Sequence, residues 1–286
     1  MPELATDGLW IGLVLLAALL HASWNALAKA SGDPLVNLAV VTSTGGLLAV
    51  PWLICLPMPG ARTWLWLGFS ATIHFAYQLS LARMYRLGEL SQVYPIARGL
   101  APLGVAMLGA TLAEERLAWH QLVGLLLASF AVVVLGRAGR PGESNREAVA
   151  MALLTALLIG TYTYSDAQGV RSVRRPEDFI AWSFFLGCVP YAMVVMVIRR
   201  GSRLTALRRV GWRAVGGGVM ATVGYGIALW AMARAPMAQI ASLRESSILF
   251  AALFGARLLG DAFGRVRVIA ALLLLVGLVL VQLQTI

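Results

Sequence analysis

The sequence predicts an all-α membrane protein in which ten transmembrane helices form two inverted five-helix repeats around a central cavity. Three observations lead to this fold class. Of the 286 residues, 59% are hydrophobic and 13% are charged, and the mean hydropathy is +0.79. A soluble core of this size could not bury so much apolar surface, so a lipid bilayer is the expected environment. The other two observations are ten apolar stretches and a repeat that relates the two halves of the chain.

Each apolar stretch is close to the length of about 20 residues that crosses a hydrocarbon core. The first group covers residues 8 to 30, 35 to 57, 64 to 85, 90 to 112 and 117 to 136. The second group covers residues 148 to 170, 179 to 198, 211 to 233, 237 to 258 and 266 to 284. The stretches lack the alternation of barrel strands, and backbone groups in lipid must pair within their own segment, so helices are expected.

Polar residues and helix breakers are distributed unevenly over these ten spans. In the first group, His21 lies in span one, His74 in span three and Pro51 in span two, and span five is almost purely aliphatic between its ends. In span four, Pro95 and Pro102 flank Arg98 and predict a kink, because each proline removes a backbone donor. In the second group, span six is rich in tyrosine, span seven contains Pro190, span eight has several glycines and span ten is aliphatic.

The end of the second group repeats the end of the first at an offset of 147 positions. In this register Glu114 corresponds to Asp261, and runs of leucine and valine also coincide. A duplicated unit with an odd number of spans enters the membrane from opposite sides in its two copies, which is the inverted-repeat arrangement of secondary transporters. The repeat therefore predicts a transport function and two domains, residues 8–136 and 148–284.

The distribution of positive charge predicts the orientation in the membrane. The net charge is +10, and the loops after odd-numbered spans, together with the span ends beside them, hold fifteen Lys and Arg residues, whereas the opposite face holds six. Because Lys and Arg accumulate on the cytoplasmic side, both termini are expected in the periplasm of a bacterial inner membrane. These arginines lie at span ends without interleaved aromatic residues, so we expect them to face lipid headgroups and not nucleic acid.

Several other function classes lack the residues that they need. The connections are too short for a soluble catalytic domain, and no H-E-x-x-H, G-x-S-x-G or Walker-type segment occurs. Cys55 and Cys188 have neither metal-ligand nor redox spacing, so no metal or cofactor is expected. An enzyme is therefore not expected. A receptor or scaffold would require neither a duplication nor charges inside the spans.

Charges inside the spans are the first candidates for a functional site. Arg98 lies in span four, Arg244 and Glu245 lie in span nine, and charges at lipid depth should face a cavity or one another. At the repeat offset of 147, Arg98 corresponds to Glu245. Two interpretations remain open at this point. Either the two residues form an ion pair that fixes helix register, or a guanidinium binds a substrate carboxylate while Glu245 receives an ammonium group or a proton.

Aromatic and polar side chains well inside the spans are the second candidates. Aromatic rings form apolar walls and tyrosine hydroxyls add hydrogen bonds, although helix packing accounts equally for any single ring. The further binding candidates are Trp24, His74, Tyr77, Gln78, Tyr94, Tyr162 and Trp230. For proton coupling the candidates are Glu245, His21 and His74, because these groups can gain or lose a proton. Asp166 is expected near the end of its span, in contact with solvent.

The stretches His21 to Lys29 and Gln92 to Pro102, with the acidic residue that closes span four and the five-span repeat, resemble the EamA-type branch of the drug/metabolite transporter superfamily. This likeness covers nearly the whole chain. It implies a basket of spans one to four and six to nine around a cavity, with spans five and ten peripheral. Exporters of aromatic and other amino acids are the nearest analogue. The small multidrug exporters of the superfamily use a glutamate in their first span, which has no acidic residue here, so their cationic-drug mechanism is not expected.

We therefore predict a secondary transporter of the inner membrane that exports small organic metabolites by alternating access. Amino acids with aromatic or hydrophobic side chains are the expected substrates, and other metabolites or amphipathic drugs are the alternative. The expected partners are this small-molecule substrate and the lipid bilayer, without nucleic acid. We expect a monomer to be sufficient for function.

Overall fold

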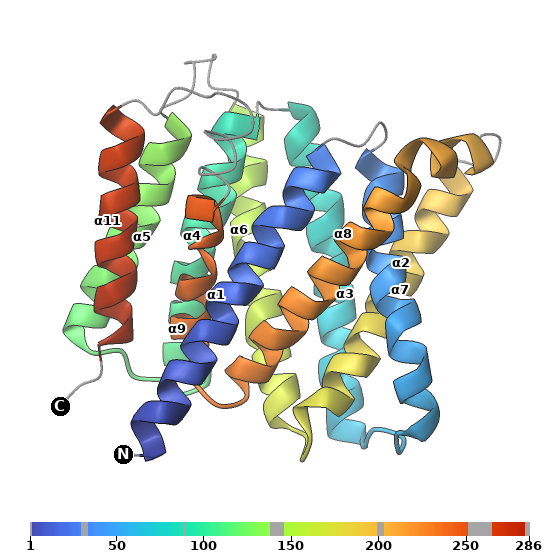
Figure 1. Cartoon of the computed structure of the whole chain (residues 1–286), viewed down its shortest axis with the longest axis horizontal. Coiled ribbons are helices and arrows are strands. Elements are labelled where there is room, and N and C mark those ends of the chain that lie inside the picture. Colours follow the sequence, from blue (N-terminus) through green and yellow to red (C-terminus); the bar gives the residue numbers. More distant parts are fainter. Residues whose placement is uncertain are drawn as a thin grey trace. The chain divides into compact units, whose positions relative to one another are not determined.

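The computed structural model describes residues 2–29, 34–87, 90–137, 146–198, 203–250 and 265–283, and it confirms the all-α fold (Figure 1). Within these ranges almost every residue is helical and no strand occurs. The ten helices bounded there are α1 (Pro2–Lys29), α2 (Pro34–Cys55), α3 (Ala61–Leu87), α4 (Leu90–Leu112), α5 (Trp119–Arg137), α6 (Arg146–Arg171), α7 (Pro176–Ile198), α8 (Arg203–Met232), α9 (Met237–Arg244) and α11 (Arg265–Gln282).

The apolar character of these helices agrees with the membrane assignment. Four segments are long and apolar enough to cross a bilayer, namely Val36–Cys55, Arg146–Arg171, Pro176–Val197 and Gly211–Met232. Four shorter apolar segments are Leu9–Asn25, Ile96–Leu112, Trp119–Val134 and Val268–Gln282. Large aliphatic side chains are exposed along α5 and α11, including Leu126 and Leu272. Such exposure is expected where lipid chains, rather than water, surround a helix.

The helices assemble into two compact units. The first unit comprises Met1–Phe75 and Ser165–Arg234, and the second comprises Ala76–Tyr164 and Ala235–Ile286. Helices α3 and α6 therefore contribute residues to both units. These units differ from the two predicted domains, which follow the sequence repeat, because each unit combines helices from both halves of the chain.

In the first unit, α1 packs against α8, and α2 packs against α7 and α8 (Figure 1). The core of this contact is formed by Val36 and Ala39 from α2, Tyr191 and Val195 from α7, and Ala214 from α8. The small and β-branched residues in this set allow the helix backbones to approach closely, which strengthens dispersion contacts where lipid offers no hydrophobic driving force.

In the second unit, α5 lies along α11, and α4 packs against α5 and α9 (Figure 1). Gly124 and Gly277 face each other so closely that a Cβ atom built on either would lie 2.6 Å from the carbonyl oxygen of the other. Glycine at both positions is therefore required for this backbone contact. The carboxylate of Glu115 accepts a 3.0 Å hydrogen bond from the backbone N–H of Met237, which satisfies a donor at the start of α9.

Two helices differ from the predicted spans. The span expected at 237–258 is not one continuous helix, because α9 ends at Arg244 and the chain turns at Glu245 and Ser246 before helix resumes. Residues 251–258 of that span, like Asp261, lie outside the described residues. Helix α8 begins before residue 211 and is interrupted at Gly211, where φ is 64°. Glycine adopts this conformation without steric cost, so the apolar part of α8 begins where the span was predicted.

Candidate functional site

The opposite charges that the repeat register relates form an ion pair in the second unit. Arg98 Nη2 lies 2.8 Å from Glu245 Oε1, and only 8% and 5% of the two side chains are exposed. Arg98 belongs to α4, and Glu245 directly follows α9. A contact of this length between opposite charges is a strong hydrogen bond, and each charge offsets the desolvation of the other.

Glu245 occupies a break between helical segments. The N–H of Glu245 donates to the carbonyl of Ser242 at 2.9 Å, and the N–H of Ser246 donates to Leu243 at 3.1 Å. Both bonds reach back three residues instead of the four of an α-helix. Serine hydroxyls compete for nearby backbone groups, so the sequence Arg-Glu-Ser-Ser favours a turn at this position.

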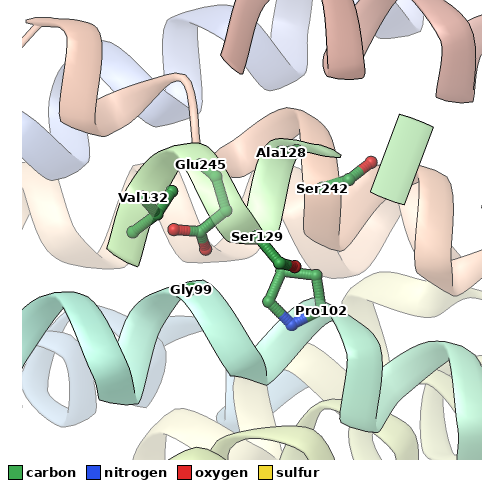
Figure 2. Close-up of a pocket in the computed structure, with 7 residues that line it drawn as sticks. All are labelled: Gly99, Pro102, Ala128, Ser129, Val132, Ser242 and Glu245. Atoms are coloured by element: carbon green, nitrogen blue, oxygen red, sulfur yellow. The ribbon is translucent and has the colours of Figure 1, made fainter. Parts of the chain in front are cut away.

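Three buried polar atoms at the break have no hydrogen-bond partner among the described residues: Arg98 Nε, Glu245 Oε2 and Ser246 Oγ. A small pocket adjoins the carboxylate and is lined by Gly99, Pro102, Ala128, Ser129, Val132, Ser242 and Glu245. Figure 2 shows the carboxylate between Val132 of α5 and Gly99 of α4. The ion pair therefore leaves a donor and an acceptor that a polar ligand could use.

Tyrosines complete the surroundings of the guanidinium. Tyr77, Tyr94 and Tyr162 are all close enough to Arg98 to interact with its charge. The rings of Tyr77 and Tyr162 meet edge to face, with centroids 5.2 Å apart. Such a ring pair forms an apolar surface beside the charge. The sequence-based candidates on α3, α4 and α6 thus come together around one buried charge.

A second polar cluster, in the first unit, surrounds Asp166 of α6. Its carboxylate accepts hydrogen bonds from the hydroxyls of Ser70 and Tyr225, and it lies 2.9 Å from His74 Nε2. Asp166 is completely buried. The expectation that this residue contacts solvent was wrong, because side chains from α3 and α8 cover it although the helix end is near.

The remaining aromatic candidates make local contacts in the first unit. Trp24 Nε1 donates a 3.3 Å hydrogen bond to His21 Nδ1 on the same face of α1. The guanidinium of Arg234 lies 3.8 Å from the ring centroid of Trp230, which is a cation–π contact near the end of α8. These contacts orient the side chains within the first unit.

The structure thus divides the predicted site residues between the units. The second unit contains Arg98, Arg244, Glu245, Tyr77, Gln78, Tyr94 and Tyr162. The first unit contains His21, Trp24, His74 and Trp230. In the second unit, the charge of Arg244 acts on Glu245, and Gln78 is buried with its Oε1 atom unpaired among the described residues.

Residues 8–137 and 146–283 each match the EamA-like transporter family, and together these ranges cover almost the whole chain. This chain belongs to the EamA-like transporter family. The two EamA matches correspond to the two five-span groups and support the two-repeat architecture. A solved structure, titled "Crystal structure of protein", has the same EamA-type fold, with a TM-score of 0.72, 19% sequence identity, and coverage of 96% of this chain and 98% of that chain. No match was found among the curated proteins.

Membership of the EamA family makes the chain a multi-pass membrane protein and a transporter of drugs or metabolites. EamA proteins are transporters, so the buried polar groups are candidates for substrate binding. The family does not define the substrate, which has to be inferred from the chemistry of the site.

Proposed function

We propose that this protein is a secondary transporter that exports amino acids with aromatic or hydrophobic side chains by alternating access. It would act in a bacterial inner membrane, with both termini in the periplasm, as the charge distribution of the loops indicates. The proposal is carried by the buried ion pair of Arg98 and Glu245, which keeps one unpaired polar atom on each partner.

An amino acid carries the same two charges as this ion pair. A substrate carboxylate can replace Glu245 as the partner of Arg98, while the substrate ammonium pairs with Glu245. At every stage each buried charge then has a partner, so opening the pair avoids leaving an isolated charge in a low-dielectric site. A substrate with only one charge would leave either Arg98 or Glu245 uncompensated.

The tyrosines indicate what the substrate side chain should be. The edge-to-face pair of Tyr77 and Tyr162 interacts with the charge of Arg98 and presents ring surface beside it. Aromatic surfaces stabilise flat or apolar groups through dispersion and edge-to-face contacts. We infer that aromatic or large aliphatic side chains are preferred to small polar ones.

The break after α9 supports movement coupled to binding. Transporters commonly place substrate groups at discontinuous helices, where the backbone can change conformation without disrupting a long run of helical hydrogen bonds. Glu245 lies at such a break. Release of its contact with Arg98 would free the turn, so substrate binding and helix movement would be linked at a single residue.

Exchange by the purified protein in liposomes tests this function. Liposomes are loaded with unlabelled L-phenylalanine, and entry of labelled L-phenylalanine is measured in the presence of increasing concentrations of competitors. We expect exchange that protein-free liposomes lack, with inhibition by L-tryptophan and L-leucine and weak inhibition by the organic cation tetraphenylphosphonium. Absence of amino-acid exchange, together with transport of the organic cation, would replace this proposal with the amphipathic-drug alternative.

A further inference from the structure

The polar cluster of the first unit is built around a buried carboxylate whose partners, among the described residues, are two hydroxyls and an imidazole. Asp166 is a fully buried carboxylate, and its partners are the hydroxyl of Ser70, the imidazole of His74 and the phenol of Tyr225. None of these three groups carries a permanent positive charge. This differs from the second unit, where Arg98 neutralises Glu245.

One proton would make this cluster neutral. A buried carboxylate without a cationic partner costs several kcal/mol, and hydrogen bonds remove only part of that cost. If His74 is neutral, the cluster carries the single negative charge of Asp166. If His74 gains a proton, it becomes an imidazolium ion and forms an ion pair with Asp166 at the 2.9 Å separation already present. Proton uptake therefore needs no rearrangement of these two side chains.

The contact between the two groups suits a shared proton. His74 Nε2 lies 2.9 Å from Asp166 Oδ2, and an imidazole that carries a proton on this nitrogen donates it to the carboxylate. The His74 side chain is 24% exposed, whereas that of Asp166 is 1% exposed. The imidazole is thus the more accessible of the two groups.

Contacts from α6 and α8 hold the imidazole of His74, which belongs to α3, in this orientation. Ser70 and His74 are four residues apart on α3, so both face Asp166 on α6. From α8, the ring of Tyr225 lies edge-on to His74, with centroids 6.0 Å apart. Among the described residues, the titratable side chains that contact Asp166 are His74 and Tyr225, and the ring of Phe184 from α7 lies beside Tyr225.

We propose that Asp166 and His74 form the proton-binding site that couples substrate export to the proton gradient. This inference rests on the proposed transport of amino acids. Two helices can link proton binding to substrate binding, because α3 and α6 each carry residues of both polar clusters. His74 and Tyr77 are three residues apart in α3, and Tyr162 and Asp166 are four residues apart in α6. A proton bound at His74 changes the charge between these two helices and can thereby shift their packing.

Two liposome assays with L-phenylalanine separate coupling from transport. Exchange at equal pH requires no net proton movement, whereas accumulation driven by a pH gradient does. We expect Asp166→Asn to retain exchange within about twofold of wild type while losing gradient-driven accumulation at least tenfold, a loss worth about 1.4 kcal/mol of driving force. His74→Gln, which retains an N–H donor for Asp166, should show the same separation. The control Glu147→Gln, on the exposed part of α6, should retain both activities.

A third measurement does not depend on the substrate. Potentiometric titration of the protein in detergent should show that Asp166→Asn binds about one proton fewer than Glu147→Gln does. Equal proton uptake by these variants, or undiminished gradient-driven accumulation by Asp166→Asn, would overturn the proton site. If wild type failed to exchange L-phenylalanine but the titration difference were present, the proposed substrate would be wrong and the proton site would stand. If Asp166→Asn did not fold, His74→Gln would decide between these outcomes.

Discussion

Arg98→Gln is expected to reduce L-phenylalanine exchange by roughly 100-fold, because removing one partner of a buried charge pair costs about 3 kcal/mol and every 1.4 kcal/mol corresponds to a factor of ten. The variant lacks the guanidinium that binds the substrate carboxylate, and it leaves Glu245 without a cationic partner at 5% side-chain exposure. The measurement is the initial rate of exchange in liposomes, corrected for the amount of folded protein from size-exclusion chromatography.

Arg83→Gln is the matched control for this experiment. Arg83 also forms an ion pair in the second unit, with Glu147 at 2.6 Å, but 64% and 52% of these side chains are exposed. Exposed pairs contribute about 0–1 kcal/mol, so this variant should keep nearly full exchange. Comparable exchange by Arg98→Gln and Arg83→Gln would show that the buried guanidinium has no role in transport.

The double variant Arg98→Met/Glu245→Leu should fold well and transport nothing measurable. Replacing a buried ion pair by apolar residues of similar size is often neutral or stabilising, by about 1–4 kcal/mol, because two desolvated charges are removed together. Thermal unfolding followed by intrinsic fluorescence should therefore give a Tm at or above that of wild type. Exchange of L-phenylalanine should fall to the level of protein-free liposomes, since neither charge of the substrate retains a partner.

This double variant separates the two roles that the sequence left open for the ion pair. If the pair only fixes the register of α4 against α9, an apolar replacement that maintains packing should preserve transport. Retained exchange with an unchanged Tm would thus assign Arg98 and Glu245 to structure alone. Lost exchange with an unchanged or raised Tm assigns them to substrate binding.

Much of the helical framework could be predicted because lipid imposes simple rules. A segment that crosses a bilayer must satisfy its own backbone groups, so apolar runs correspond closely to helices. The span predicted at residues 90 to 112 coincides with α4, Leu90–Leu112. The register of the repeat also related Arg98 to Glu245, and these two residues are in contact in the structure.

The break after α9 was not predictable from hydropathy. Apolar residues occur on both sides of the polar run Arg244 to Ser247, and the average hydropathy of the span indicates one uninterrupted helix. The chain turns because of local hydrogen bonds that reach back three residues, beside consecutive serines. A hydropathy average does not include this competition for backbone groups.

The burial of Asp166 depends on contacts that sequence spacing does not reveal. Ser70 and Tyr225, which donate to its carboxylate, are 96 and 59 residues away in sequence. Only the packing of α3 and α8 around α6 brings them together. One signal was available, because Ser70 and His74 are spaced by one helical turn and form a polar face on an otherwise apolar helix.

Binding of three ligands that share a phenyl ring tests the central claim most directly. L-phenylalanine has both charges, 2-phenylethylamine has only the ammonium group, and 3-phenylpropionate has only the carboxylate. If the ion pair opens to receive a zwitterion, calorimetry on the purified protein should show L-phenylalanine binding at least about 100-fold more tightly than either analogue, since a lost partner for a buried charge costs about 3 kcal/mol. Equal affinity for L-phenylalanine and either singly charged ligand would contradict the exchange of charges between Arg98, Glu245 and the substrate.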